Sequence, residues 1–201
     1  MGVNMIGHCM SAEDVCCSAA REEIIRRYYY ALCNLAEKGD NENEVNKISL
    51  IMKQAKLTTD YRKTTTAAHE RKSKEGVPCS AIELQDGTII TSRTSPLLGP
   101  SAALILNATK HLAGIPHHVK LIPEEMIAPI QKTKVEYLHG HNPRLHTDEI
   151  LVALSLLSLN DENCRNALAQ LPRLKGCQMH STVMLSEVDH KVFKKLGVGL
   201  T

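Results

Sequence analysis

The chain has 201 residues, and its content of 43% hydrophobic and 23% charged residues is typical of soluble globular proteins. A formal net charge of +2, the lack of Trp and a single Phe offer neither a strongly basic surface nor aromatic stacking platforms, so no nucleic-acid partner is predicted. The longest apolar stretch, residues 150–159, is interrupted by Ser155 and Ser158 and is too short to cross a bilayer, so no membrane partner is predicted.

The cysteines indicate a reduced protein. Their number is odd, no CxxC pair occurs among them, and no secretory signal pattern precedes them. We therefore predict a cytoplasmic chain without disulfides, with no metal site and no cofactor. The seven cysteines are Cys9, Cys16, Cys17, Cys33, Cys79, Cys164 and Cys177.

Residues 1–75 predict a helical subdomain. An S-x-x-D cap at Ser11 and Asp14 and a typical stop at Gly39 delimit a long helix over about residues 11–38. Apolar side chains recur every four positions, and acidic residues stand four positions before arginines, which is typical of a buried stripe with a charged outer face. The stripe is Ala20, Ile24, Tyr28 and Leu32, and the charged residues are Glu22, Glu23, Arg26 and Arg27.

A second helix is predicted over residues 43–56. Its inward face would consist of Val45, Ile48, Met52 and Ala55. The polar residues 58–75 are expected to form a short exposed helix, a linker, or both.

Residues 76–201 predict an α/β subdomain, because strand-like and helix-like segments alternate. A hairpin is expected from strands at 81–84 and 88–92, with Asp86 and Gly87 in the turn. A helix should begin at Gly99-Pro100 and end at Gly114. Further strands are expected at 118–122, 177–185 and 198–201.

The remaining helices of this subdomain are identified by their caps and by Pro. One starts at Pro123 and is kinked or divided at Pro129, and a nearly all-apolar, buried one covers 148–159. Asn160 caps a helix at 161–171, and Ser186-x-x-Asp189 caps a last helix before Gly197. The predicted fold is an α/β three-layer sandwich with a mixed sheet, preceded by a helical subdomain.

Several segments together carry a family resemblance. They are GVNMIG (2–7), EIIRRYY (23–29), AIELQDGTI (81–89), TSPLLGPSAALILNA (94–108), LAGIP (112–116), NPRLHTDEILVALS (142–155) and RLKGCQMHSTVMLSEVD (173–189). In this combination the chain resembles the C-terminal portion of domain-of-unknown-function family 1846, a mostly bacterial family. The resemblance implies a cytidine-deaminase-like topology after a separate helical subdomain. It also implies that the chain corresponds to the final part of a longer pattern, and it implies no activity.

Three enzyme classes are disfavoured because their motifs are missing. A zinc deaminase needs a His or Cys ligand and a Glu where the helix after the hairpin reads GPSAALIL, together with a P-C-x-x-C pair. A metalloprotease needs H-E-x-x-H, whereas His69-Glu70 is followed by Arg, Lys and Ser. Residues 87–94 resemble a degraded P-loop, but their β-branched residues favour a strand over a loop of free backbone amides.

An anion site is a candidate at the start of the helix that follows the hairpin. A helix N-terminus carries partial positive charge and free N–H groups, and hydroxyls and an arginine precede it in the sequence. The alternative is a loop in which the hydroxyls cap the turn and the arginine is solvated. The candidate residues are Ser92, Arg93, Thr94, Ser95 and Ser101.

A polar pocket is the second candidate site, around the stretch HGHNPRLHTDE at 139–149. Its acidic end is explained as a charged cap on the following helix, and its first two histidines are uninformative. Cys177 and His180 form C-x-x-H, but positions three apart in a strand point to opposite faces, which favours a buried Cys over a zinc knuckle. The candidate pocket residues are Asn142, Arg144, His146, Cys177 and His180.

Two hypotheses of function follow. The first is a domain that binds an anionic small molecule, with a phosphate or carboxylate group. The second is a non-catalytic assembly domain, whose helical part packs against a partner chain or a second copy of itself and makes the protein a homo-oligomer or part of a complex.

Overall fold

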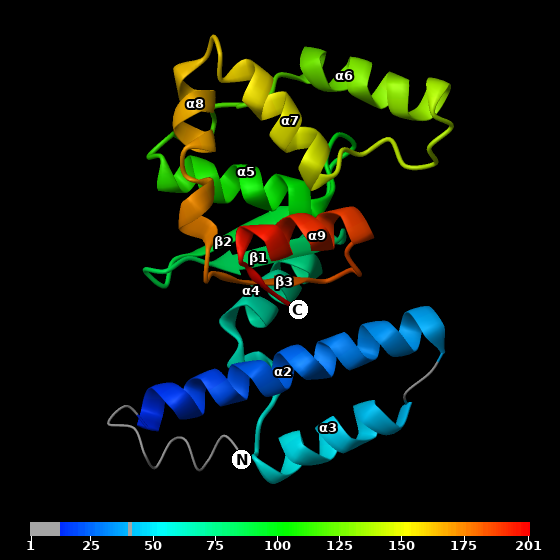
Figure 1. Ribbon diagram of the computed structural model, residues 1–201, viewed down its shortest axis with the longest axis vertical. Coiled ribbons are helices and arrows are strands. Elements are labelled where there is room, and N and C mark those ends of the chain that lie inside the picture. Colours follow the sequence, from blue (N-terminus) through cyan, green and yellow to red (C-terminus); the bar gives the residue numbers. More distant parts are fainter. Residues whose placement is uncertain (1–12, 40–41) are drawn as a thin grey trace.

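The computed structural model describes residues 13–39 and 42–201, which form two stacked parts (Figure 1). The lower part is a helical pair, α2 (Glu13–Lys38) and α3 (Glu42–Gln54). The upper part is a sheet with helices on both faces, so the predicted α/β class and preceding helices are confirmed. The cap predicted at Ser11 lies outside the described residues.

The helical pair encloses a small apolar core. Ile24 and Tyr28 of the predicted stripe pack against this core, and Gly39 follows α2 in the left-handed conformation with φ of 66°. Ala55 was expected to point inward but is exposed, because α3 ends at Gln54. The buried residues of this core are Ile25, Met52 and Leu57.

The charged face of α2 is only partly as predicted. Glu23 accepts hydrogen bonds from Arg26 at 2.6 Å and Arg27 at 2.8 Å, which together lower its pKa to about 2. Glu22 was expected to pair within the helix, but its Oε2 lies 3.1 Å from Nη1 of the buried Arg62. Glu22 could pair with Arg26 on the same helix, but the packing of α2 against the rest of the chain places it next to Arg62.

Residues 58–75 are not a solvated linker. They form a short 3-10 helix, η1 (Thr59–Tyr61), and the helix α4 (Lys63–Glu75), which lies against three strands of the sheet. Thr64 and Ala68 stand four positions apart on the buried face, and their small side chains allow the helix to approach the strands closely. The division of the chain at residues 75 and 76 stays a prediction.

The sheet has four strands in the order β2-β1-β3-β4 among the described residues. They are β1 (Cys79–Glu83), β2 (Ile89–Arg93), β3 (Gln178–Ser181) and β4 (Gly199–Leu200). β1 pairs antiparallel with β2 and β3, and β4 is parallel to β3, so the predicted mixed sheet is confirmed. In the hairpin turn Gly87 has φ of 82°, and Asp86 accepts a hydrogen bond from the backbone N–H of Thr88 at 2.9 Å.

Alternation along the strands divides their side chains between two helical layers. Thr91 and His180 face α4, whereas Ile82 and Met179 face α5 (Pro100–Leu112) and join the main core. The strand predicted over 177–185 ends at Ser181. The segment after Ser181 is therefore available to approach the start of α5.

The remaining helices lie above α5 and in front of the sheet in the view of Figure 1. They are α6 (Glu124–Lys132), which contains Pro129, a π-helical segment η2 (Thr133–Tyr137), α7 (Thr147–Leu157), α8 (Glu162–Leu168), the 3-10 helix η3 (Leu171–Leu174) and α9 (Glu187–Leu196). The predicted cap Asn160 is wrong by one position, because Asp161 accepts the hydrogen bond from the Cys164 N–H at 3.1 Å.

The strand predicted at 118–122 does not form. Nζ of Lys110 donates hydrogen bonds to the carbonyls of His117 and Val119, at 2.6 Å each. These carbonyl groups are therefore bound by an ammonium group and do not pair with a neighbouring strand. Burial lowers the pKa of this ammonium group. Leu121 and Ile122 supply the apolar character that suggested a strand, and both are buried in the main core.

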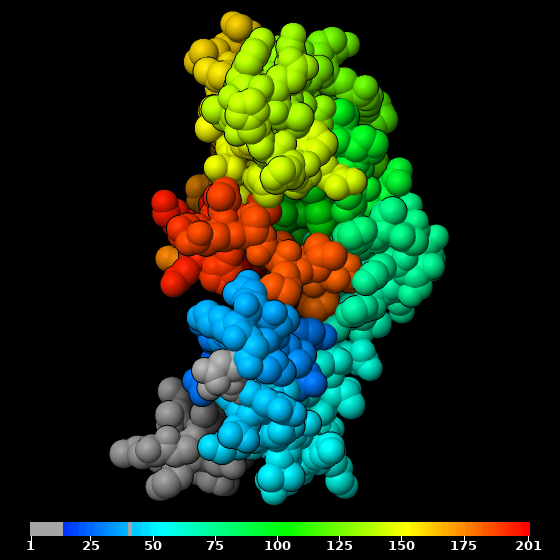
Figure 2. Space-filling model, turned by 90° about the vertical axis from the view of Figure 1, so that its right-hand side faces the viewer, coloured from blue at the N-terminus to red at the C-terminus, as the bar shows by residue number. Residues whose placement is uncertain are grey.

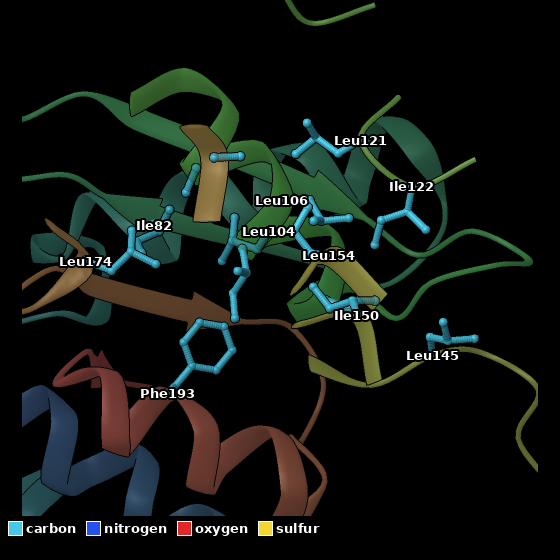
Figure 3. Close-up of a cluster of buried hydrophobic side chains, with 14 of the residues drawn as sticks. Ile82, Leu104, Leu106, Leu121, Ile122, Leu145, Ile150, Leu154, Leu174 and Phe193 are labelled. Carbon is cyan, nitrogen blue, oxygen red and sulfur yellow. The ribbon is translucent and has the colours of Figure 1, made fainter. Parts of the chain in front are cut away.

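The main core lies between the sheet and the upper helices, and Figure 3 shows Phe193 of α9 pointing toward the side chains of α5 and the sheet. Cys164 and Cys177 are buried in it, and burial raises the pKa of both thiols. The helix predicted to be buried at 148–159 is buried on one face only. Ile150 and Leu154 are buried, whereas the apolar side chains of Val152 and Leu156 are 63% and 61% exposed.

A buried polar seam joins the helical pair to the sheet. The side chain of Arg62 is 1% exposed, and besides Glu22 it reaches Oε1 of Gln178 at 3.3 Å and the Met179 carbonyl at 3.4 Å. Beside it the ring of Tyr29 lies 4.9 Å from that of His180. These contacts fix α2 against β3.

Within residues 13–39 and 42–201, no helix is both long and apolar enough to span a membrane. The finer likeness to the cytidine-deaminase topology stays a prediction.

Replacing Arg62 by Ala should lower the free energy of unfolding by about 3 kcal/mol, because it leaves Glu22 without its buried partner. Arg27→Ala removes an exposed ion pair with Glu23 within α2, and it should lower the free energy of unfolding by at most about 1 kcal/mol. Urea unfolding followed by circular dichroism measures both free energies of unfolding. Equal losses in the two variants would show that the buried contacts of Arg62 do not stabilise the packing of α2 against the sheet.

Candidate functional site

A cavity of about 350 Å³ lies where the N-terminal ends of α5, α7 and α9 meet. Figure 2 views the face on which the green start of α5, the yellow-green loop before α7 and the orange-red segment before α9 come together. Its volume falls at the lower end of the range of small-molecule sites. The cavity is lined by Pro78, Thr94, Gly99, Pro100, Ser101, Asn142, Arg144, Leu145, His146, Val183, Met184, Leu185, Ser186 and Asp189.

Two backbone hydrogen bonds bring the starts of α5 and α7 together. The Leu145 N–H donates to the Leu97 carbonyl at 2.9 Å, and the Gly99 N–H donates to the Leu145 carbonyl at 3.3 Å. They form an isolated parallel bridge between Leu98 and Leu145, and the Leu145 side chain is buried in the core below. Both helices therefore begin on the same side of the cavity wall.

The carboxylate of Asp189 joins α7 to α9. Its Oδ1 accepts a hydrogen bond from the Thr147 N–H at 2.8 Å, and its Oδ2 accepts one from the Ser186 hydroxyl at 2.9 Å. Burial alone would raise the pKa of Asp189, but the hydrogen bonds from Thr147, His146 and Ser186 together lower it. The positive ends of these two helices are thus already compensated from within the protein.

His146 caps α7 and contacts the same carboxylate. Its backbone N–H donates to Oε2 of Glu149 at 2.7 Å, and Nδ1 of its ring lies 3.2 Å from Oδ2 of Asp189 and 3.2 Å from the Ser186 hydroxyl. Lys134 holds the loop from outside, since its Nζ reaches Glu149 at 2.8 Å and the Arg144 carbonyl at 2.9 Å. The loop before α7 is fixed at both ends.

Arg144, on the same loop, also lines the cavity. Its Nε donates to the Ser95 carbonyl at 2.9 Å, and its backbone N–H donates to Oδ1 of Asn142 at 3.1 Å. Its Nη groups have no partner among the described residues, although the side chain lines the cavity. They remain available for a ligand.

Ser101 is the buried polar residue of the cavity wall. It stands in the first turn of α5 and is 2% exposed, yet its hydroxyl has no hydrogen-bond partner within the described part of the chain. The hydroxyl oxygen is not among the unpartnered side-chain atoms that are sealed from solvent, so it keeps some access to the cavity. Backbone N–H groups in a first helical turn have no partner within the helix.

The predicted anion-site residues divide between the two faces of the sheet. Ser101 and Thr94 line the cavity, and Ser95 lies behind it, where it accepts hydrogen bonds from Leu97 and Leu98. Ser92 is buried beneath the start of α5 and donates to the Pro100 carbonyl at 2.6 Å. Arg93 points to the opposite face, where its Nη1 lies 3.5 Å from Glu75, because neighbouring strand residues alternate.

The residues expected in a polar pocket divide in the same way. Asn142, Arg144 and His146 line the cavity, whereas Cys177 belongs to the main core and His180 faces α4. Burial, with smaller contributions from His69 and Arg62, lowers the pKa of His180 to about 3. His180 is therefore not the second wall of this pocket, and the C-x-x-H residues point apart as their spacing predicted.

The second wall consists of residues that sequence reasoning missed. Ser186 and Asp189 were interpreted only as a helix cap, and the segment 183–185 as part of a strand. The pattern S-x-x-D predicts the cap of α9, but it does not indicate that Asp189 also accepts a hydrogen bond at the start of α7. Residues 87–94 hold a turn and strand β2, not a P-loop, and within the described chain no group of three or more His, Cys, Asp or Glu has metal-binding geometry.

Comparisons with known proteins agree along the whole chain. A model for the N-terminal part of domain of unknown function DUF1846 matches residues 1–56, and one for its C-terminal part matches residues 60–201. The chain is 46% identical to a UPF0371 protein of Corynebacterium urealyticum, 45% to one of Corynebacterium aurimucosum and 44% to one of Streptococcus pyogenes serotype M5. All 201 residues are covered, but they span only 40%, 40% and 41% of these relatives.

Asp189→Asn should cost about 2 kcal/mol of unfolding free energy at pH 6, since it removes the charge from a buried hydrogen-bonded carboxylate. The folded-state pKa of Asp189 is lowered, so its stabilisation is present above the unfolded value of 3.8 and is lost as pH falls through the folded value. The cost should thus be smaller at pH 3 than at pH 6 in urea titrations.

Asp148→Asn is the control for this measurement, because Asp148 occupies the first turn of α7 but is exposed. It should cost no more than about 0.5 kcal/mol at either pH. If Asp189→Asn lowered the free energy of unfolding equally at both pH values, the charge of the Asp189 carboxylate would not stabilise the contact between α7 and α9.

Proposed function

The chain belongs to the DUF1846 family, as its motifs predicted, and from this premise we propose that its α/β part binds a small molecule with a phosphate or carboxylate group. The binding site is the cavity at the starts of α5, α7 and α9. Ser101 carries the proposal, because it is a buried residue that lines the cavity at a helix N-terminus and its hydroxyl has no partner among the described residues. The chain spans about two fifths of its curated relatives, so the proposal concerns this part of the family pattern.

The electrostatic arrangement favours one end of the cavity for the anion. Asp189 compensates the starts of α7 and α9, whereas the start of α5 has no acidic residue in its first turn. The free Nη groups of Arg144 belong to a side chain that lines the same cavity and that donates through Nε to the Ser95 carbonyl. A guanidinium and a helix N-terminus together match the geometry of a phosphate or carboxylate group.

Arg144→Ala should weaken binding of inorganic phosphate about 10- to 100-fold, because a charge-assisted hydrogen bond is lost. Ser101→Ala should weaken it up to about tenfold through loss of a neutral hydrogen bond. Isothermal titration calorimetry with phosphate and with acetate measures both effects.

Arg93→Ala is the matched control, since it removes the same charge from the other face of the sheet. It should leave phosphate affinity within about twofold, as expected of a distant exposed charge. An equal effect of Arg93→Ala and Arg144→Ala would argue against this cavity, and the lack of any anion binding by the wild-type protein would refute the proposal.

A second candidate function is self-assembly through the helical pair α2–α3. Among the described residues its core contains three buried apolar side chains, while Leu50 and Ile51 on α3 are 57% and 47% exposed and Tyr30 on α2 is 58% exposed. Exposed apolar side chains of this kind favour burial against another surface. We propose a second copy of this chain as the occupant, which is a function of a different class from ligand binding.

Leu50→Glu should shift a concentration-dependent oligomer toward the monomer, because association would bury the new carboxylate. Sedimentation velocity over a hundredfold range of concentration measures the change. Leu156→Glu, an exposed apolar position on α7, is the control. A wild-type protein that is monomeric throughout this range would exclude self-assembly.

A further inference from the structure

The ring of His146 is held by an acid and a hydroxyl that act on one nitrogen. Oδ2 of Asp189 and Oγ of Ser186 both lie 3.2 Å from Nδ1. The Ser186 hydroxyl also donates to Oδ2 of Asp189 at 2.9 Å and accepts from the Asp189 N–H at 3.1 Å. Ring, hydroxyl and carboxylate therefore form a closed set of contacts at the cavity wall.

This set favours one of the two neutral tautomers of the ring. A carboxylate only accepts hydrogen bonds, and the single proton of the Ser186 hydroxyl is already directed at Asp189. The 3.2 Å contact between Nδ1 and Oδ2 of Asp189 is a hydrogen bond when Nδ1 carries the ring proton. A neutral imidazole has one N–H, so Nε2 has a lone pair and accepts hydrogen bonds.

The arrangement differs from a Ser-His-Asp catalytic triad. In a triad the acid and the nucleophilic hydroxyl contact opposite ring nitrogens, so that the ring can take the hydroxyl proton. Here Ser186 and Asp189 share Nδ1, and the serine proton goes to the carboxylate. Ser186 is a positioning residue, and the functional group that remains is Nε2.

Nε2 of His146 is free to contact a ligand. It makes no hydrogen bond to any residue in 13–39 or 42–201, and it is absent from the polar atoms that are sealed from solvent. The His146 side chain is 26% exposed, against 7% for Asp189, and it lines the same cavity as Ser101 and Arg144. The cavity therefore combines donors for an anion with one acceptor of fixed orientation.

We infer that the cavity is built for an anion that also carries a hydroxyl group, such as a phosphorylated or carboxylated polyol, whose hydroxyl donates to Nε2 of His146. This inference rests on the proposed anion binding and names the class of ligand for the same site. A second anionic group is disfavoured at this position, because it would meet a lone pair backed by the Asp189 carboxylate.

A pair of esters of equal size tests the inference. 2-Hydroxyethyl phosphate and propyl phosphate differ by a hydroxyl in place of a methyl group. Calorimetric titration of the wild-type protein should give about tenfold tighter binding of the hydroxyl ester, as expected for one hydrogen bond to a site that otherwise leaves an acceptor unpaired. Equal affinities would overturn the inference and leave anion binding intact, whereas binding of neither ester would overturn both.

His146→Leu should bring the affinities for the two esters to within about twofold of one another, because the acceptor is removed. Arg144→Ala should weaken both esters together and keep their ratio, since it acts on the shared phosphate group. A ratio that persists in His146→Leu would place the hydroxyl elsewhere in the cavity and overturn the role of His146.

Asp189→Asn inverts the tautomer in a way that NMR detects without any ligand. The new amide can keep an oxygen on the Thr147 N–H and place its NH₂ toward Nδ1, which moves the ring proton to Nε2. Nitrogen–proton correlation spectra should show the Nδ1–H tautomer of His146 in the wild type and Nε2–H in the variant. An Nε2–H tautomer in the wild type would overturn the inference, whether or not the variant folds.

Discussion

The carboxylate of Asp189 holds the starts of α7 and α9 to one another, and the candidate site depends on this contact. It binds the first N–H group of α7, the hydroxyl that caps α9 and the ring of His146. A buried carboxylate is costly unless such donors surround it, so the three partners must stay in place together. These hydrogen bonds therefore fix one part of the cavity wall, and the unpaired donors of Ser101 and Arg144 line the same cavity.

The sheet supplies the second constraint, because its alternation separates residues that are neighbours in sequence. Ser92 lies under the start of α5 while Arg93 pairs with Glu75 behind the sheet. Cys177 enters the main core while His180 faces α4. One residue of each predicted set, Arg93 and His180, thus lies on the far face, and five of the other residues line one cavity.

The helical pair is joined to this α/β part by a small polar seam. Arg62 reaches from the start of α4 to Glu22 on α2 and to the backbone of β3. The two family models divide the chain between residues 56 and 60, close to this seam. The helical pair therefore matches the N-terminal part of the family pattern.

Local sequence determined the class of fold, most of the helices, the hairpin and the family. Caps, glycine stops and period-two alternation act over a few residues, so Gly39, Asp86-Gly87 and Ser186-x-x-Asp189 could be interpreted without knowledge of the rest of the chain. It also singled out five of the fourteen residues that line the cavity, namely Ser101, Thr94, Asn142, Arg144 and His146.

Only the tertiary structure decided the partners of groups that are far apart in sequence. Lys110 donates to the carbonyls of His117 and Val119, at the expected strand. Glu22 pairs with Arg62 and not with Arg26, and Asp189 accepts a hydrogen bond from Thr147, which is 42 positions away in the sequence. Each of these choices depends on which donors and acceptors become buried together. A buried polar group must find a partner wherever packing places one, and no local pattern in the sequence records that place.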